Sequence, residues 1–269
     1  MDEILDAMKP LPLISIVTIA FNASRYIEST ARSIAAQTYP STECILIDGA
    51  STDDTIDRYR SVIGDRAIVY SEKDDGIYDA MNRGALRASG ELIIFMHADD
   101  EFVSSSSLMS LYSALASSEK KWISAFYLTR NSRNEIIKRD RLKPFTFADM
   151  LRADQIRHQT ALVPTAWVRE FPFRKQFKYA MDYDHFLHVW EKYGPPEILL
   201  DYIAFFRWDG NNLSSHFEQS LRDEWQVKMS FHKDRGNRVA IVRDTLVYVL
   251  RLLKIKIYYN TVYGRKKKS

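Results

Sequence analysis

Along residues 13–96, short apolar runs alternate with stretches in which apolar residues recur at helical spacing. The apolar runs are rich in β-branched residues and have the length of buried strands. They cover residues 13–21, 43–49, 67–74 and 91–96. The stretches of helical periodicity between them cover residues 23–37, 51–63 and 77–89. This alternation predicts an α/β fold with a mainly parallel, twisted sheet, right-handed crossovers and helices on both faces.

Polar residues follow each predicted strand, at the sheet edge where ligands bind in such folds. Asn22 follows the first strand, Asp48 ends the second and Asp75 follows the third. The fourth strand runs into "HADDE", residues 97–101. Two interpretations of these acids are open at this point. They form either an acidic turn that caps the next helix or a site that holds a cation.

The end of the second strand also has two interpretations. Ser51 and Asp54 have the spacing of a capping box at the start of the next helix. Asp48 stands at the strand end itself, before the glycine, where capping is not its obvious task. In dinucleotide-binding folds, a carboxylate at this place accepts hydrogen bonds from the bound nucleotide.

The composition is that of a globular protein with a sizeable core, since 46% of the 269 residues are hydrophobic. A net charge of +3 is too small to indicate a nucleic-acid partner. Cys44 is the single cysteine, which favours a reducing compartment. The acidic residues 1–12 lack the apolar core of a signal peptide. No apolar run approaches the roughly 20 residues that span a bilayer. We therefore expect a soluble, cytoplasmic protein.

The C-terminal residues 239–269 have an apolar stripe at helical spacing, followed by the basic tail Arg265 to Lys268. The stripe consists of Val239, Val242, Leu246, Val249, Leu250, Leu253 and Ile257. One interpretation is a helix that packs on the domain and carries a solvated tail. The other is an amphipathic, basic element that meets anionic lipid, so that the protein is peripheral at the inner face of the membrane.

Four segments, in this order and spacing, resemble the family-two glycosyltransferases. They read "ISIVTIAFNASRYIESTARSIAAQTYP", "ILIDGASTDDT", "DDGIYDAMNRGALRASGELIIFMHADDEF" and "MDYDHFLHVWEKYG". The resemblance covers residues 12–215 and is nearest to bacterial transferases that build exopolysaccharide or lipopolysaccharide. It implies a GT-A (Rossmann-like) fold and inverting transfer from a nucleotide-diphosphate sugar. The glycine-rich fingerprint of nicotinamide enzymes does not follow the first strand.

The resemblance also implies how the acids after the fourth strand are used. In the family, an Asp-x-Asp motif at this place holds Mn²⁺ or Mg²⁺ against the donor diphosphate. Asp99 matches the second, metal-bound acid, and His97 replaces the first. Some relatives bring a histidine from the region of His216 to the metal. The resemblance therefore predicts a divalent cation held by Asp99 and His216, with Asp100 capping the following helix or orienting its neighbour.

The remaining roles are carried over residue by residue. Asp182 matches the catalytic base, the carboxylate that takes the proton of the attacking hydroxyl, and Met181 replaces the glutamate that usually precedes it. His158, Gln159 and Asp184 are placed on the acceptor side, although Asp184 also suits the first turn of a helix. The predicted donor-binding residues are Thr18, Asn22, Asp48, Asp75, Asn82, Arg83 and His97.

The sequence thus predicts a metal-dependent hexosyl or N-acetylhexosaminyl transferase of cell-surface polysaccharide biosynthesis. The GT-A domain is expected over residues 1–215, with a nucleotide-sugar half at 12–100 and an acceptor half at 101–215. A helical extension is expected over 216–269. The partners are a nucleotide-diphosphate sugar and a carbohydrate or lipid-linked sugar acceptor, with no nucleic acid. Two alternatives stay open: a non-catalytic, membrane-associated scaffold and a sugar nucleotidyltransferase.

Overall fold

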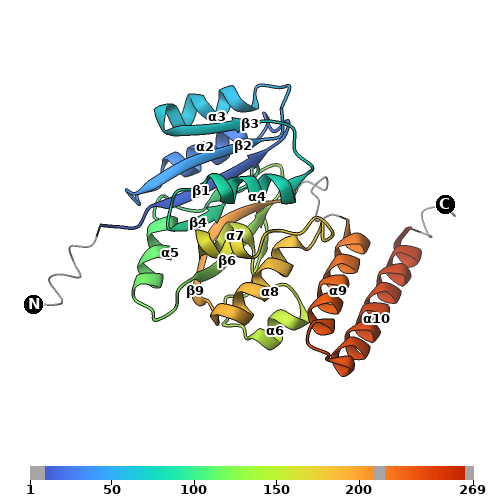
Figure 1. Ribbon diagram of the computed structural model, residues 1–269. Coiled ribbons are helices and arrows are strands. Elements are labelled where there is room, and N and C mark those ends of the chain that lie inside the picture. The colour runs from blue at the N-terminus through green and yellow to red at the C-terminus, as the bar shows by residue number, and fades with distance from the viewer. Residues whose placement is uncertain (1–9, 209–215, 264–269) are drawn as a thin grey trace, which may run out of the picture.

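The computed structural model describes residues 10–208 and 216–263. Within these residues the strands form one curved sheet, ordered β3-β2-β1-β4-β8-β6-β9-β5, with β7 paired to β6 (Figure 1). The strands are β1 Ile14–Ala20, β2 Thr42–Asp48, β3 Ala67–Ser71, β4 Leu92–Phe95, β5 Glu101–Phe102, β6 Ile123–Arg130, β7 Ile136–Arg139, β8 Ala161–Pro164 and β9 Glu197–Arg207.

Helices cover both faces of this sheet, as the alternation predicts (Figure 1). The α-helices are α2 Ile27–Ala35, α3 Thr55–Ile63, α4 Ile77–Arg87, α5 Ser107–Ala116, α6 Phe147–Arg152, α7 Thr165–Glu170, α8 Met181–Tyr193, α9 Phe217–Lys233 and α10 Arg238–Tyr263. Two short 3-10 helices are η1 Gly64–Arg66 and η2 His158–Thr160.

The first four strands pair in parallel, which confirms the predicted topology of this half. Their register places Ala20 opposite Asp48, and Asp48 opposite Ser71. The carboxyl ends of β1, β2 and β3 therefore lie at one edge of the sheet. Beyond β4 the sheet is mixed, because β8 pairs antiparallel with β4 and with β6, whereas β9 runs parallel to β6.

The core lies in two layers, one on each face of the sheet. On one face, Ile14 and Ile16 of β1 pack with the apolar residues of α2, α3 and α5. On the other face, Val17 and Ile19 pack with those of α4 and α8. Helix α4 comes very close to the sheet at Gly84, where a Cβ atom would lie 2.4 Å from Val17 Cγ1. The second of these layers joins β1 to α8.

The capping box predicted at Ser51 and Asp54 is wrong. Helix α3 begins at Thr55 with Asp54 as its N-cap residue, and the Asp54 side chain makes no capping hydrogen bond, whereas Asp53 Oδ1 accepts from the Thr55 N–H at 3.1 Å. Between β2 and α3 the backbone turns through Ala50, whose φ is 63°. This turn brings Ser51 back to the strand end, where it hydrogen-bonds to Asp48 rather than to the helix.

The predicted C-terminal helix exists as α10, which packs side by side with α9 (Figure 1). The basic tail Arg265 to Lys268 and the predicted domain boundary at residue 215 lie outside the described residues. Among the helices that the structure describes, none is long and apolar enough to cross a membrane.

The buried histidine of α8 predicts a pH dependence of stability. His185 is 1% exposed, and its Nδ1 lies 2.6 Å from the carbonyl oxygen of Phe171. Burial outweighs this hydrogen bond and lowers the pKa of His185 to about 4. Because the folded pKa lies below that of the unfolded chain, folding stability is lost as the pH falls through this window. Between pH 6.5 and 5 we expect a loss of about 2 kcal/mol from this residue.

Urea unfolding of the wild type and of His185→Leu at a series of pH values measures this contribution. The variant is less stable at pH 7, where it lacks the hydrogen bond to Phe171, but its free energy of unfolding falls less steeply towards pH 5. Parallel pH profiles of the two proteins would contradict the assignment.

Candidate functional site

Five of the predicted site residues line one cavity of about 670 Å³ at the carboxyl end of β4. They are His97, Asp99, His158, Gln159 and Asp182. The loop after β4 supplies the first two, η2 supplies the next two, and the first turn of α8 supplies Asp182. Aromatic side chains of β6 and β9 and of the segment before α8 complete the wall. They include Tyr127, Phe206, Trp208 and Tyr179.

His158 joins two carboxylates of this cavity. Its Nε2 lies 3.3 Å from Asp100 Oδ2, and its Nδ1 lies 3.7 Å from Asp182 Oδ2. Burial alone lowers the pKa of His158, but the hydrogen bonds and charges of Asp100 and Asp182 outweigh it and raise the pKa to about 9. The imidazole is therefore protonated at neutral pH and holds both acids by charge.

Asp182 remains ionised in this setting. Its burial favours the neutral acid, but His158 and the nearby Arg157 guanidinium lower its pKa below the usual value. Asp182 Oδ1 also accepts a hydrogen bond of 3.0 Å from the backbone N–H of Tyr183. The carboxylate is thus oriented from two sides and still reaches the cavity.

His97 stacks on His158, with ring centroids 3.9 Å apart and an angle of 22° between the planes. Burial, followed by repulsion from His158, lowers the pKa of His97 well below its usual value, so this ring is neutral. Among the described residues its Nε2 is buried and has no hydrogen-bond partner. A neutral ring with an unpartnered nitrogen at this place is available to a ligand.

Asp99 is half-buried beside Asp100, which is 2% exposed. Burial, and then repulsion from Asp100, raises the pKa of Asp99 to about 7. Asp100 accepts only long hydrogen bonds, at 3.3 Å from His158 and 3.4 Å from Gln159 Nε2. Two adjacent carboxylates of this kind favour a cation between them and the cavity.

The potential ligand atoms differ from the predicted pair Asp99 and His216. Within the described residues, single ligand atoms of His97, Asp100 and His158 all lie within 4.8 Å of one another. Asp99 lines the same cavity. The neutral His97 nitrogen and the carboxylate oxygens suit a divalent cation such as Mn²⁺ or Mg²⁺, whereas His158 would have to lose a proton before it could bind one. The unpartnered His97 Nε2 agrees with such a ligand set.

His216 does not belong to this group. It is exposed at the N-cap of α9, and its ring lies 5.7 Å from the ring of Tyr179. Asp100 takes the place that the sequence assigned to His216. It neither caps a helix nor points to solvent, because its side chain is buried against η2.

The predicted donor-binding residues at the ends of β1 and β2 brace the loops there. The Asn22 backbone N–H donates to Ser51 Oγ at 2.8 Å, and Asn22 Oδ1 accepts from the Thr52 N–H at 2.9 Å. Asp48 is fully buried and accepts hydrogen bonds from Ser51 and from Ser71 Oγ, the latter at 2.7 Å. Their contact with a donor stays a prediction.

Thr18 lies elsewhere. Its side chain is fully buried on the sheet face that packs against α2 and α3, next to Tyr59 of α3. The predicted side-chain contact of Thr18 with a nucleoside is therefore wrong, because residues alternate between the faces of a strand and this one points into the core.

The segment from β3 to α4 holds the other predicted donor residues, which contact protein groups. Asn82 pairs through both ends of its amide with the backbone of Phe173, at 2.8 and 2.9 Å. Arg83 forms an ion pair of 2.8 Å with Asp79. Asp75 is exposed and lies 3.3 Å from Lys175 Nζ. Asp75 remains accessible to a donor, whereas Asn82 and Arg83 fix the shape of this loop.

Asp184 is not on the acceptor side as predicted. It is 2% exposed, and its carboxylate accepts hydrogen bonds from two nitrogens of the Arg174 guanidinium, with Nε 2.6 Å from Oδ2. The helix turn explains this, since Asp182 and Asp184 are two positions apart and point to different faces. Asp182 meets the cavity, and Asp184 secures the segment before α8.

Further charged residues that line the cavity were missed by the sequence analysis. They are Lys138, Asp154, Arg157, Lys178 and Glu224. Asp154 and Arg157 form an ion pair in the segment before η2, and both line the cavity. Burial, and then the charges of Asp182 and Glu224, outweigh the attraction of Arg157 and raise the pKa of Asp154 to about 7. The three-residue spacing of Asp154 and Arg157 is compatible with an ion pair, but nothing in the sequence indicates that this pair faces Asp182.

Comparison with known proteins identifies relatives of this chain. A family model described as "Glycosyl transferase family 2" matches residues 15–177. The PGL/p-HBAD biosynthesis glycosyltransferase of Mycobacterium bovis (strain BCG / Pasteur 1173P2) is 37% identical over 100 residues, which are 36% of this chain and 39% of that protein. The putative teichuronic acid biosynthesis glycosyltransferase TuaG of Bacillus subtilis (strain 168) is 36% identical over 94 residues, which are 34% of this chain and 37% of TuaG. The matched segment therefore spans under two fifths of these relatives' own length.

Solved structures with a similar fold confirm the predicted fold class. S. aureus TarS 1-349 in complex with UDP-GlcNAc has a TM-score of 0.65 at 17% identity, over 80% of this chain and 65% of that one. The mannosyltransferase PcManGT from Pyrobaculum calidifontis, in complex with GDP-Man and Mn2+, has a TM-score of 0.64 at 14% identity, over 96% of this chain and 83% of that one.

The ion pair between Asp184 and Arg174 predicts that a substitution of Asp184 lowers the stability of the fold. Asp184→Asn leaves the partly buried Arg174 without its counter-charge. We expect the free energy of unfolding to fall by about 2–3 kcal/mol, somewhat less than for a fully buried pair. Urea denaturation measures it. The matched control is Lys175→Gln, which removes the exposed pair with Asp75 and should leave stability unchanged. Equal stability of Asp184→Asn and the wild type would contradict the anchoring role.

Proposed function

The chain belongs to glycosyl transferase family 2, and we propose that it is an inverting enzyme that transfers a sugar from a nucleotide-diphosphate sugar to an acceptor hydroxyl. The observation that carries this proposal is the arrangement across the cavity. The ionised Asp182 faces the acidic loop of Asp99 and Asp100, with His158 between them. One side offers a base, and the other offers a place for a charged diphosphate bound through a cation.

Asp182 is the proposed base. Inverting transfer requires the acceptor hydroxyl to lose its proton while its oxygen attacks the anomeric carbon from the face opposite the leaving diphosphate. An ionised carboxylate within hydrogen-bond reach accepts that proton. His158 and the Tyr183 backbone N–H fix the orientation of Asp182, so little has to move when the acceptor binds.

His97, Asp99 and Asp100 are the proposed holders of a divalent cation, Mn²⁺ or Mg²⁺, because the protonated His158 beside them has no lone pair free for a metal. When bound, such an ion neutralises the charge that develops on the nucleoside diphosphate as it leaves. The residues themselves supply carboxylate charge and the unpartnered His97 Nε2 at the carboxyl end of β4. PcManGT, whose structure contains GDP-Man and Mn2+, supports this proposal by analogy of fold.

The edge formed by β1, β2 and β3 is the proposed seat of the donor nucleoside. Asn22 and Asp75 are exposed there, and Asp48 holds the loop beneath them. The structures of TarS with UDP-GlcNAc and of PcManGT with GDP-Man support a nucleotide-diphosphate donor, and hence hexosyl or N-acetylhexosaminyl transfer.

The acceptor is proposed to be a carbohydrate or a lipid-linked sugar in cell-surface polysaccharide biosynthesis. The aromatic residues Tyr179 and Trp208 in the cavity wall suit the apolar faces of sugar rings. The relatives named for PGL/p-HBAD and teichuronic acid biosynthesis support this context. We propose that the protein works in the cytoplasm at the inner face of the membrane, with residues 1–215 as the catalytic domain and 216–269 as an extension.

The role of Asp182 is tested by release of nucleoside diphosphate from a panel of nucleotide-diphosphate sugars with Mn²⁺. We expect Asp182→Asn to lower kcat by about 10²–10⁴-fold, the usual contribution of general base catalysis, with unchanged donor affinity. Asp65→Asn, an exposed acid far from the cavity, is the matched control. Full activity of Asp182→Asn would exclude the proposed base. Donor binding without turnover in the wild type, with any acceptor, would favour the scaffold alternative.

The proposed cation ligands are tested by titration with Mn²⁺ after treatment with EDTA. We expect Asp99→Ala and Asp100→Asn to raise the Mn²⁺ concentration for half-maximal turnover at least tenfold, because each loses a charged oxygen ligand. His216→Ala is expected to behave as the wild type, since His216 lies outside the group. Loss of metal response in His216→Ala alone would contradict the assignment.

A further inference from the structure

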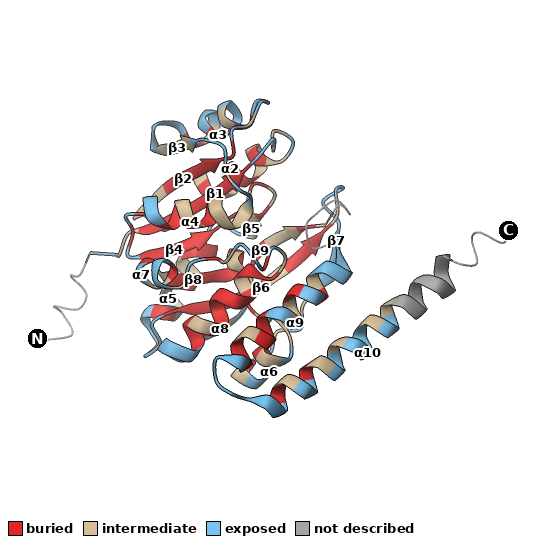
Figure 2. Ribbon diagram, turned by 45° about the vertical axis from the view of Figure 1, so that its right-hand side comes forward, coloured by how far each residue is buried: buried red, intermediate tan, exposed pale blue. Residues whose placement is uncertain are grey.

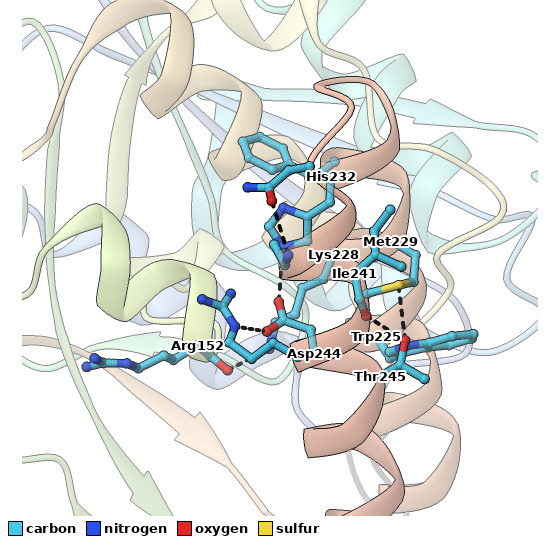
Figure 3. A network of polar contacts seen from close by, with 12 residues as sticks. Arg152, Trp225, Lys228, Met229, His232, Ile241, Asp244 and Thr245 are labelled. Atoms are coloured by element: carbon cyan, nitrogen blue, oxygen red, sulfur yellow. Dashed lines mark hydrogen bonds and ion pairs between the residues drawn. The ribbon is translucent and has the colours of Figure 1, made fainter.

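Helix α10 has two apolar faces, and one of them is used inside the molecule. This face packs on α9, where Tyr248 stacks on Trp225 with ring centroids 4.9 Å apart. Trp225 Nε1 donates to Thr245 Oγ1 at 3.2 Å, and His232 Nε2 lies 3.0 Å from Asp244 Oδ2 (Figure 3). These contacts fix which side of α10 faces outward.

The outward side of α10 is also apolar. Every third or fourth residue is a valine or leucine, and all are exposed, from 82% at Val239 to 43% at Val249. The stripe consists of Val239, Val242, Leu246, Val249, Leu250 and Leu253. At 3.6 residues per turn these positions lie within one arc of the helix, and the stripe is about 21 Å long. Figure 2 shows α10 at the rim of the molecule, with exposed positions along its length.

The exposed charges of α10 are all basic in the part whose side chains the structure describes, residues 238–255. Arg238, Arg243, Arg251 and Lys254 are exposed. Asp244 is the one acid there, and it is 8% exposed and paired with Arg243 and His232. By helical position, Arg238 borders one edge of the stripe, and Arg243 and Lys254 border the other. An apolar stripe between two basic edges complements a surface of acyl chains and anionic headgroups.

We propose that α10 docks through this stripe on a bilayer that contains anionic lipid. A second copy of the chain fits the stripe less well, because it would bring a second set of these cations against the first. The helix would lie in the plane of the interface, since none of the described helices can span the membrane. This proposal deepens the proposed function. It rests on that function in one respect, because transfer to a lipid-linked acceptor gives the protein a reason to bind the membrane surface.

A second cavity, of about 540 Å³, opens beside the docking face between α6, α9 and α10. Four of its lining side chains are cationic and two are acidic. The cations are Arg152, Lys228, Arg243 and Arg251, and the acids are Glu224 and Asp244. Of these cations, Arg243 borders the stripe, whereas Arg251 pairs with Glu224 at 2.9 Å. Glu224 lines both this cavity and the catalytic one, so the two adjoin through α9.

Sedimentation of the full chain with vesicles tests the proposal without donor, acceptor or metal. We expect binding to vesicles of phosphatidylcholine with phosphatidylglycerol and none to phosphatidylcholine alone. The double variant Leu246→Ser/Leu250→Ser should bind at least about tenfold more weakly. The double variant Arg238→Gln/Lys254→Gln should lose about fivefold for each removed cation and show a smaller effect of salt. Leu86→Ser, a 70% exposed leucine on α4, is the matched control and should bind as the wild type does.

Equal binding of the stripe variant and the wild type would overturn the proposal. A wild type that is dimeric by light scattering, binds no vesicles and becomes monomeric in Leu246→Ser/Leu250→Ser would overturn it in favour of a second copy. Release of nucleoside diphosphate from soluble donor is measured in parallel. Turnover without vesicle binding rejects the docking alone, whereas vesicle binding without turnover on any donor rejects the proposed function alone.

Discussion

The site depends on one electrostatic constraint: carboxylates that are taken out of water must share positive charge. Asp100 and Asp182 come from opposite sides of the cavity and meet on the two nitrogens of one imidazole, His158. Burial, and then the neighbouring Asp100, raise the pKa of Asp99 to about 7. Desolvation and neighbouring charges thus give two acids of one cavity different properties. Asp182 is a stable anion that is suited to accept a proton, and Asp99, whose pKa is raised, is suited to a cation.

Much of the fold was predictable, because it rests on local periodicity. The four parallel strands and three helices of residues 13–89 and 91–96 follow from their patterns, with ends displaced by a few residues. Parallel register then places the residues after β1, β2 and β4 at one edge, so Asn22, Asp48 and Asp99 could be named as edge residues without a structure. The antiparallel strand β8, which carries η2 into the site, has no comparable signal.

The partners of these residues were not predictable, since they depend on segments that meet only in three dimensions. Asp100 was assigned to a helix cap or to orienting its neighbour, and it is buried against His158. Asp184 was placed beside an acceptor and instead holds Arg174. A sequence shows which residues carry charge, but the choice between neighbouring acids depends on which one the packing turns inward. His97, which stands where the motif has an acid, stacks its ring on His158. The motif alone could not show this contact.

The two-residue strand β5 has a consequence for the order of assembly. Glu101 and Phe102, directly after the acidic loop, pair with Phe205 and Ala204 of β9. The parallel half from β1 to β4 lies within residues 14–95, whereas the loop that follows it is also braced by β6, η2 and β9, which are made later. During synthesis, the nascent chain would carry a folded parallel sheet before it carries an organised cavity. A ribosome-bound intermediate of this protein is therefore a scaffold first and a catalyst only after β9 has emerged.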